Sequence, residues 1–116
     1  MGHLPEAAHD VAAVSLFVAY EGDASSRFDR TYYVEHHLPI VAAAFGDFGL
    51  LDLSALFPAV ARRGTIALCE CRFRDEAAIA AAFGSEAAAG VMADVPNFTD
   101  LQPRRFRVVP LEATRA

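Results

Sequence analysis

The sequence has little positive charge, and this shortage argues against a nucleic-acid-binding protein. Arginine and lysine together contribute 10 residues against 15 aspartates and glutamates, so the net charge is −5. The only basic clusters are two Arg-Arg pairs, at 62–63 and 104–105, which we interpret as solvated surface. Because nucleic acids are bound through extended basic patches, we expect no nucleic-acid partner.

Long apolar runs are also missing. No run reaches the roughly 20 residues that a membrane-spanning helix needs. The first ten residues carry Glu6 and Asp10 and lack the order of a secretory signal, which is a basic start followed by an apolar stretch. We therefore expect no membrane partner and a cytoplasmic location.

The fingerprints of cofactor binding are absent as well. The sequence holds neither a glycine-rich phosphate loop nor the Cys-x-x-Cys-His attachment of haem. Cys69 and Cys71 are the only cysteines. They are too close for an ordinary disulfide, and no second pair completes a zinc site. The four histidines show no metal-ligand spacing, so we predict no cofactor, no metal and two buried thiols.

Apolar residues, in contrast, are abundant. They make up 54% of the 116 residues, a high share for a chain that fits one domain. Such an excess predicts an apolar face kept for a ligand or a partner, and a second copy of the chain is the commonest cover. We expect a homodimer, with a flexible lead over residues 1–10, one domain over 11–110 and a tail over 111–116.

Hydrophobic periodicity predicts the regular elements. A run rich in β-formers is typical of a buried strand, whereas Val34, Leu38, Val41 and Phe45 recur at helical spacing. Ser26 is the expected N-cap of the first helix. The expected elements are strands over 12–20, 48–57, 65–73 and 101–109 and helices over 28–45 and 75–93, the second helix being broken at Gly84.

This order of elements indicates an α+β fold, the ferredoxin-like β-α-β-β-α-β arrangement. Both helices must then cover one face of a four-stranded antiparallel sheet. The other face is left bare and too apolar to meet water alone. Two copies placed face to face would close a barrel-like space between their sheets, and that space is the expected ligand pocket.

Two tyrosine–histidine pairs lie side by side in the first helix. Tyr33 and His37 are one turn apart, and so are Tyr32 and His36, so the side chains of each pair can touch. On a helical projection His37 borders the apolar stripe, whereas His36 points away from it. We expect His37 at an enclosed functional position and His36 at a surface or subunit contact. The alternative is that the pairs only anchor the helix.

Pro39 adds an irregularity close to these pairs. It cannot donate a hydrogen bond to the carbonyl of Glu35, and it disfavours helical geometry at Leu38. The helix should therefore kink or restart just after His37. Irregular backbone inside a regular element often accompanies a site. A histidine there can shuttle protons, and a tyrosine can hold a ligand oxygen by a hydrogen bond.

Two stretches of the sequence resemble the signature of EthD proteins. The first is Phe28-Asp29-x-x-Tyr32-Tyr33-x-x-x-His37-x-Pro39-Ile40, and the second is Asp94-Val95-Pro96-Asn97-Phe98-Thr99-Asp100-x-Gln102-Pro103. Together with the element order, the resemblance covers residues 11–109. It implies a dimeric α-β barrel in which Tyr33 and His37 are the conserved pair, framed by Asp29, Tyr32 and Pro39. His36 is not part of the pattern, and residues 50–64 lack the glycine-rich loop of many members.

The resemblance leaves three functions open. The first is a dimeric protein that binds a small apolar or aromatic oxygenated molecule in a bacterial degradation or biosynthetic pathway. The second is a cofactor-independent monooxygenase, isomerase, dehydratase or cyclase, with His37 as general base and Tyr33 holding a substrate oxygen. The third is an accessory module for a partner oxygenase. Some proteins of this architecture bind haem through one histidine, an alternative that we rank low.

Other polar side chains receive weaker assignments. Tyr20 closes the first strand on the face of Leu16 and Val18, and it either lines the pocket or simply packs. The tentative ligand pocket comprises Tyr20, Tyr32, His36 and Asp29. Two aspartates, at 94 and 100, flank a turn, where such residues usually bond the local backbone, and we interpret them in that way.

Overall fold

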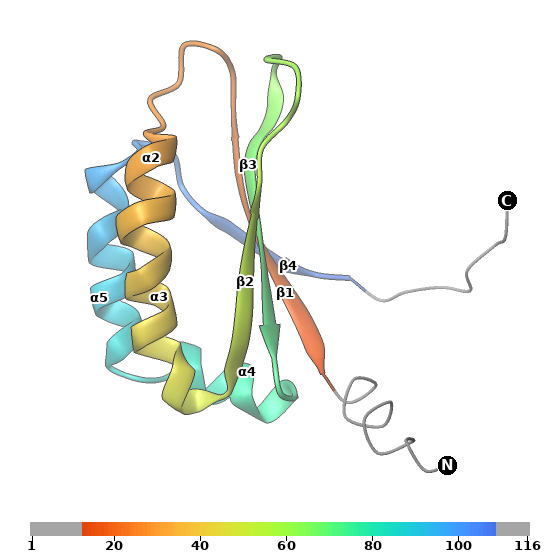
Figure 1. Cartoon of the computed structure of the whole chain (residues 1–116), viewed down its shortest axis with the longest axis vertical. Coiled ribbons are helices and arrows are strands. Elements are labelled where there is room, and N and C mark those ends of the chain that lie inside the picture. Colours follow the sequence, from red (N-terminus) through yellow and green to blue (C-terminus); the bar gives the residue numbers. More distant parts are fainter. Residues whose placement is uncertain (1–12, 109–116) are drawn as a thin grey trace, which may run out of the picture.

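A twisted four-stranded antiparallel sheet carries all the helices on one face (Figure 1). The computed structural model describes residues 13–108, so the predicted lead over 1–10 and tail over 111–116 lie outside the described residues. The strands are β1 (Val14–Gly22), β2 (Leu50–Leu56), β3 (Gly64–Phe73) and β4 (Arg104–Arg107). The helices are α2 (Arg30–Tyr32), α3 (Leu38–Phe45), α4 (Glu76–Phe83) and α5 (Ala87–Asp94).

The sheet has the strand order β2-β3-β1-β4. β1 and β3 pair along their whole length, from Val14 opposite Phe73 to Gly22 opposite Gly64. β4 is short and covers only the middle of β1. It is shorter than the predicted strand over 101–109 because Pro103 has no N–H group for a ladder hydrogen bond. The predicted α+β fold with ferredoxin-like element order is confirmed.

The core lies between the sheet and the helices. Every second residue of β3, from Ala67 to Phe73, faces the helix layer and is buried. These side chains meet Val41 and Phe45 of α3 and Ala78 and Ala82 of α4. The small alanines let α4 approach the sheet closely. Asp75 caps α4 as its sequence suggests, because its carboxylate accepts a hydrogen bond from the Ala78 N–H at 2.8 Å.

The first helical segment starts later than predicted. Asp29, not Ser26, is the N-cap, since its carboxylate accepts a hydrogen bond from the Tyr32 N–H at 2.9 Å. The Ser26 hydroxyl is engaged in the preceding turn, where it accepts a hydrogen bond from the Asp23 N–H at 3.0 Å. Asp29 is therefore a structural cap rather than a pocket residue.

A π-helix interrupts this segment from Tyr33 to His37, and α-helix resumes at Leu38. The Leu38 N–H bonds the Tyr33 carbonyl, five residues back, which widens the turn. The restart just after His37 is the irregularity that Pro39 predicts. The wide turn also rotates the preceding residues, so Val34, assigned to the apolar stripe by its spacing, is 44% exposed.

The sheet face opposite the helices is more polar than its sequence suggests. The Ser15 hydroxyl donates a hydrogen bond to the Glu70 carboxylate at 2.7 Å, and Arg72 forms an ion pair with Asp52 at 3.0 Å. These groups lie beside apolar ones, including a stacked pair of Phe17 and Phe106 rings whose centroids are 5.6 Å apart. The face therefore offers a mixed surface rather than a purely apolar one.

Within residues 13–108, no single helix has the length and apolar composition needed to cross a membrane. The stretches Glu76–Phe83 and Ala87–Asn97 reach that length and composition only together, and they are bent by 73° at their junction.

Candidate functional site

The π-helix presents Tyr33 and His37 toward the sheet. Tyr33 is 1% and His37 is 4% exposed. Their rings are stacked, with centroids 5.5 Å apart and planes 18° apart. Phe98 packs against both rings, at 5.0 Å from Tyr33 and 4.6 Å from His37. The predicted contact of this pair and its burial are thus present, and the histidine is held in a fixed orientation.

His37 has a buried carboxylate partner, Asp94, at the end of α5. The His37 Nδ1 atom lies 2.9 Å from the Asp94 Oδ2 atom, and Asp94 is 9% exposed. An ionised carboxylate only accepts hydrogen bonds, so Nδ1 carries the proton and Nε2 carries the lone pair. No residue in the described part of the chain bonds Nε2. This nitrogen is therefore the atom of His37 that a ligand can use.

The other oxygen of Asp94 is held by two further groups. The Tyr32 hydroxyl donates to Oδ1 at 2.6 Å, and the Asn97 amide donates to it at 2.9 Å. The same amide lies 3.3 Å from the Tyr32 hydroxyl. With both oxygens occupied, the carboxylate of Asp94 cannot turn away from His37.

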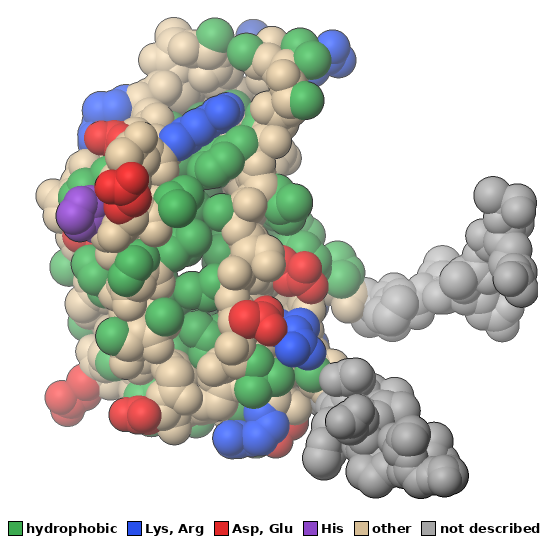
Figure 2. Space-filling view, in the orientation of Figure 1, with side chains coloured by type: hydrophobic (Ala, Val, Ile, Leu, Met, Phe, Trp, Pro, Cys, Tyr) green, Lys and Arg blue, Asp and Glu red, His purple; other side chains and the backbone are tan. Residues whose placement is uncertain are grey.

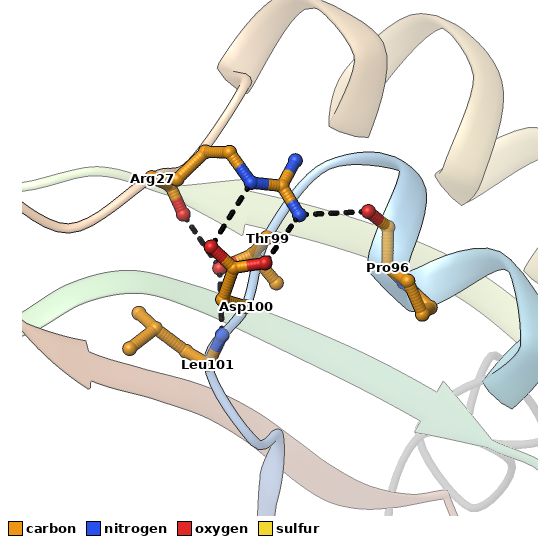
Figure 3. A network of polar contacts seen from close by, with 5 residues as sticks. All are labelled: Arg27, Pro96, Thr99, Asp100 and Leu101. Carbon is orange, nitrogen blue, oxygen red and sulfur yellow. Dashed lines mark hydrogen bonds and ion pairs between the residues drawn. The ribbon is translucent and has the colours of Figure 1, made fainter.

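A second polar cluster fastens the segment that carries Asp94 to the start of the first helix (Figure 3). The Arg27 guanidinium contacts the Asp100 carboxylate at 2.8 Å and the Pro96 carbonyl at 2.7 Å. The Thr99 hydroxyl donates to the Arg27 carbonyl at 2.7 Å and accepts from the Leu101 N–H at 3.1 Å. Arg27 directly precedes the first stretch of the EthD resemblance, and the Asp29 N–H within that stretch donates a hydrogen bond to the Phe98 carbonyl of the second stretch at 2.9 Å.

A cavity of about 330 Å³ lies on the inner side of His37, between the sheet and the helices. Hydrophobic side chains gather along the seam between these two layers (Figure 2). The polar groups on the cavity wall come from Tyr20, Tyr33, His37, the two cysteines and Arg105. The lining apolar residues are Val18, Leu38, Val41, Phe45, Leu53, Phe83, Ala88, Val91, Met92, Val95 and Pro103.

This cavity differs in position from the pocket expected from the sequence. It is formed by the sheet and helices of one chain, whereas the expected pocket lies between the sheets of two copies and stays a prediction. Small residues of the helix layer, such as Ala88 on the cavity wall, leave space over the sheet.

Burial sets the protonation state of the site. Loss of water lowers the pKa of His37 below its ordinary value, although the hydrogen bond to Asp94 acts in the opposite direction. Burial also opposes ionisation of Asp94, but the hydrogen bonds from Tyr32, Asn97 and His37 outweigh it and hold the pKa of Asp94 below its usual range. Neutral histidine beside an ionised aspartate is therefore the resting state at neutral pH.

The tyrosines on the cavity wall stay protonated. Burial strongly raises the pKa of both Tyr33 and Tyr20, so each phenol keeps its proton and can donate a hydrogen bond. The Tyr33 hydroxyl interacts with the Cys69 thiol. Cys69 and Cys71 are both buried, as predicted, with sulfur atoms 3.9 Å apart. Within residues 13–108, no group of three or more histidine, cysteine or acidic side chains could hold a metal ion.

The structure separates the residues proposed from the sequence into three groups. Tyr33, His37 and Tyr20 line the cavity. Tyr32 lies behind the histidine, on Asp94. His36 is exposed and packs on the Tyr32 ring at 4.9 Å, and it is absent from the cavity wall, as is Asp29.

Asp94 is the functional residue that sequence reasoning missed, because its turn suggested only local backbone bonding. Its side chain instead bonds His37, 57 residues away. The available signal was the resemblance itself. The second matching stretch begins at Asp94, and a stretch that accompanies a histidine motif is a candidate source of its partner.

Comparisons with known proteins agree on the family. The model of the EthD domain matches residues 22–102. An EthD-like protein from Ralstonia eutropha JMP134 is similar in structure, with 24% identity, a TM-score of 0.70 and coverage of 90% of this chain and 98% of its own. An ethyl tert-butyl ether degradation (EthD) family protein from Bacillus halodurans C-125 has 17% identity and a TM-score of 0.61, covering 84% and 99%.

A more distant similarity in fold is to SnoaB from Streptomyces nogalater, described as a cofactor-independent oxygenase. It shares 11% identity and a TM-score of 0.60, over 86% of this chain and 96% of SnoaB. No curated protein matches the chain. The family model spans well over half of the sequence, so the chain belongs to the EthD family.

Proposed function

We propose that this protein binds a small, largely apolar molecule that carries oxygen, in the cavity between its sheet and helices. The wall of this cavity is mostly hydrocarbon with a few polar groups, the composition typical of small-molecule sites. Its volume of about 330 Å³ suits one small ligand. Tyr33 supplies a phenol that burial keeps protonated, so it can donate a hydrogen bond to a ligand oxygen.

A second candidate, catalysis of proton transfer, is favoured by one observation, the buried His37–Asp94 pair. In resting form the Nε2 atom of His37 has a free lone pair, and Asp94 fixes the ring from behind. This is the arrangement of a general base oriented by a carboxylate. The Nε2 atom takes a proton from an acidic C–H or O–H group of the ligand, and the electron pair stays on the ligand. Asp94 stabilises the imidazolium that forms.

The remaining parts of this proposal concern assembly and context. A homodimer would cover the mixed outer face of the sheet, where the Phe17–Phe106 stack lies. SnoaB, similar in fold, is described as cofactor-independent, and this supports a reaction in which the residues of the chain act without a bound cofactor. A role as an accessory to a partner oxygenase is the third candidate, and no feature of the described residues favours it.

The test separates binding from catalysis. Phenols, quinones and lactones are screened by isothermal titration calorimetry against the wild type, His37→Gln and the matched control His36→Gln. A ligand of the cavity should bind the wild type and the His36 variant alike and the His37 variant about tenfold more weakly, because roughly one hydrogen bond is lost. Equal binding to all three proteins would remove His37 from the site.

A second variant tests the role of His37 as a general base. Asp94→Asn keeps the shape of the side chain, but its amide can donate to Nδ1 and so move the histidine proton to Nε2. Any turnover found in the screen should fall by several orders of magnitude while affinity changes little. Turnover that survives Asp94→Asn would show that the His37–Asp94 pair is not the base of the reaction.

A further inference from the structure

Arg105 is exposed, as its Arg-Arg sequence suggested, and it is also part of the cavity wall. In β4 it stands directly opposite Val18 of β1. Directly opposed residues of antiparallel strands point to the same face of the sheet. Arg105 therefore points to the helix side, as does Arg107, which bonds Glu76 of α4. Arg104, the residue before Arg105, stands opposite Ala19 and points to the other face.

The guanidinium of Arg105 is held by an aromatic ring, and no ion pair neutralises its charge. Its central carbon lies 4.4 Å from the centroid of the Phe83 ring, a cation–π contact. None of the ion pairs found among residues 13–108 involves Arg105. None of the side-chain hydrogen bonds found among residues 13–108 involves Arg105, so the N–H donors of its guanidinium stay available.

Arg105 is also the one permanently charged group among the residues that line the cavity, and no carboxylate lines it. Histidine, tyrosine and cysteine side chains supply the other polar atoms of the wall. The edge of a guanidinium matches a carboxylate, with two parallel N–H···O bonds. A carboxylate placed there would meet no like charge from the lining residues.

We infer that the ligand carries a carboxylate that pairs with Arg105, while its apolar, ring-containing body fills the cavity toward His37 and Tyr33. The substrate class is thus an aromatic or alicyclic carboxylic acid. Arg105 acts as a specificity-determining residue, remote from the proton-transfer step. This inference rests on the proposed function, since it names the ligand of the same cavity.

The test uses two probes that differ in charge but little in shape, 2-naphthoate and 2-acetonaphthone. Their affinities are measured by calorimetry for the wild type, Arg105→Gln, Arg105→Lys and Arg104→Gln. The wild type should bind naphthoate about tenfold more tightly than the neutral ketone, and Arg105→Gln should abolish this preference without changing ketone affinity. Arg105→Lys should keep part of the preference, and Arg104→Gln should keep all of it.

The outcomes distinguish this inference from the proposed function. If the wild type binds both probes equally well, or if Arg105→Gln retains the preference for naphthoate, the carboxylate inference is overturned while the binding cavity stands. If neither probe binds, both the inference and the proposed apolar-ligand cavity fail. If Arg104→Gln removes the preference as fully as Arg105→Gln does, general surface charge rather than the cavity wall selects the acid.

Discussion

The two tyrosine–histidine pairs of the first helix have the same residue types and the same spacing, yet the fold uses them differently. Tyr33 and His37 are buried and line the cavity. Tyr32 and His36 pack on each other with tilted rings, His36 being exposed, and Tyr32 also supports the other pair by bonding Asp94. A shift of one residue along a helix turns a side chain by about 100°. The direction in which the side chains point, and not their residue type, therefore decides which pair lines the cavity and which pair lies behind it.

Truncation of the tyrosines should produce the largest difference between the two pairs. Tyr33→Ala removes a ring that packs against Tyr20, Phe28 and Phe98, and should lower the free energy of unfolding by about 3–5 kcal/mol. Tyr32→Ala should cost clearly less, because that ring borders solvent. Urea denaturation of both variants measures the difference. Equal losses would show that the two rings are equivalent in the core.

Removal of the carboxylate behind His37 should have an intermediate effect. Asp94→Ala leaves the Nδ1–H group of His37 buried without an acceptor, and we expect a loss of about 1–3 kcal/mol in stability. Asp100→Ala is the matched control, since it removes an exposed carboxylate from the same turn region. Thermal unfolding should show a larger drop in Tm for Asp94→Ala. A larger drop for Asp100→Ala would mean that the Arg27 cluster, and not the buried pair, holds this segment.

The smallest expected effect is a pH dependence of stability that comes from His37. Burial lowers the pKa of His37 below its ordinary value of 6.5, so below that pH the unfolded chain takes up a proton more readily than the folded protein. Stability should therefore be complete above about pH 6.5 and fall as the pH drops toward the folded-state pKa, by less than ~1.4 kcal/mol per pH unit.

Denaturation at several pH values with two variants tests this dependence. His37→Gln should flatten the slope just below pH 6.5, and His36→Gln should keep it because His37 is still in place. The lowered pKa of Asp94 adds a separate loss at more acidic pH, as the pH falls below its ordinary value of 3.8 and through its folded-state pKa. If His37→Gln keeps the slope of stability against pH, a group other than His37 produces that slope.

Local patterns allowed much of this structure to be predicted. Periodicity identified the elements and their order, because burial on a strand or helix leaves a repeat of fixed length. The contact between Tyr33 and His37 followed from helical spacing, and the helix restart followed from the missing N–H group of Pro39. Each of these depends on residues close together in the sequence.

The features that escaped prediction depend on residues far apart. The bond from Asp94 to His37 spans 57 residues, and the role of Arg105 depends on its register with Val18 across the sheet. No local pattern encodes either. The cavity between the sheet and the helices was not predicted for a similar reason, since its volume depends on how far the helix layer stands from the sheet.

The π-helix from Tyr33 to His37 has a further consequence for the history of this site. A wide turn of this kind holds one more residue than the α-helical turn it replaces, so it corresponds to a single-residue insertion in an ordinary helix. Loss of one residue here would restore a regular helix and rotate everything before it by about 100° relative to α3. Tyr32 would then leave Asp94, and the N-cap at Asp29 would leave its turn. A change of three nucleotides thus separates an ordinary amphipathic helix from one that carries this site.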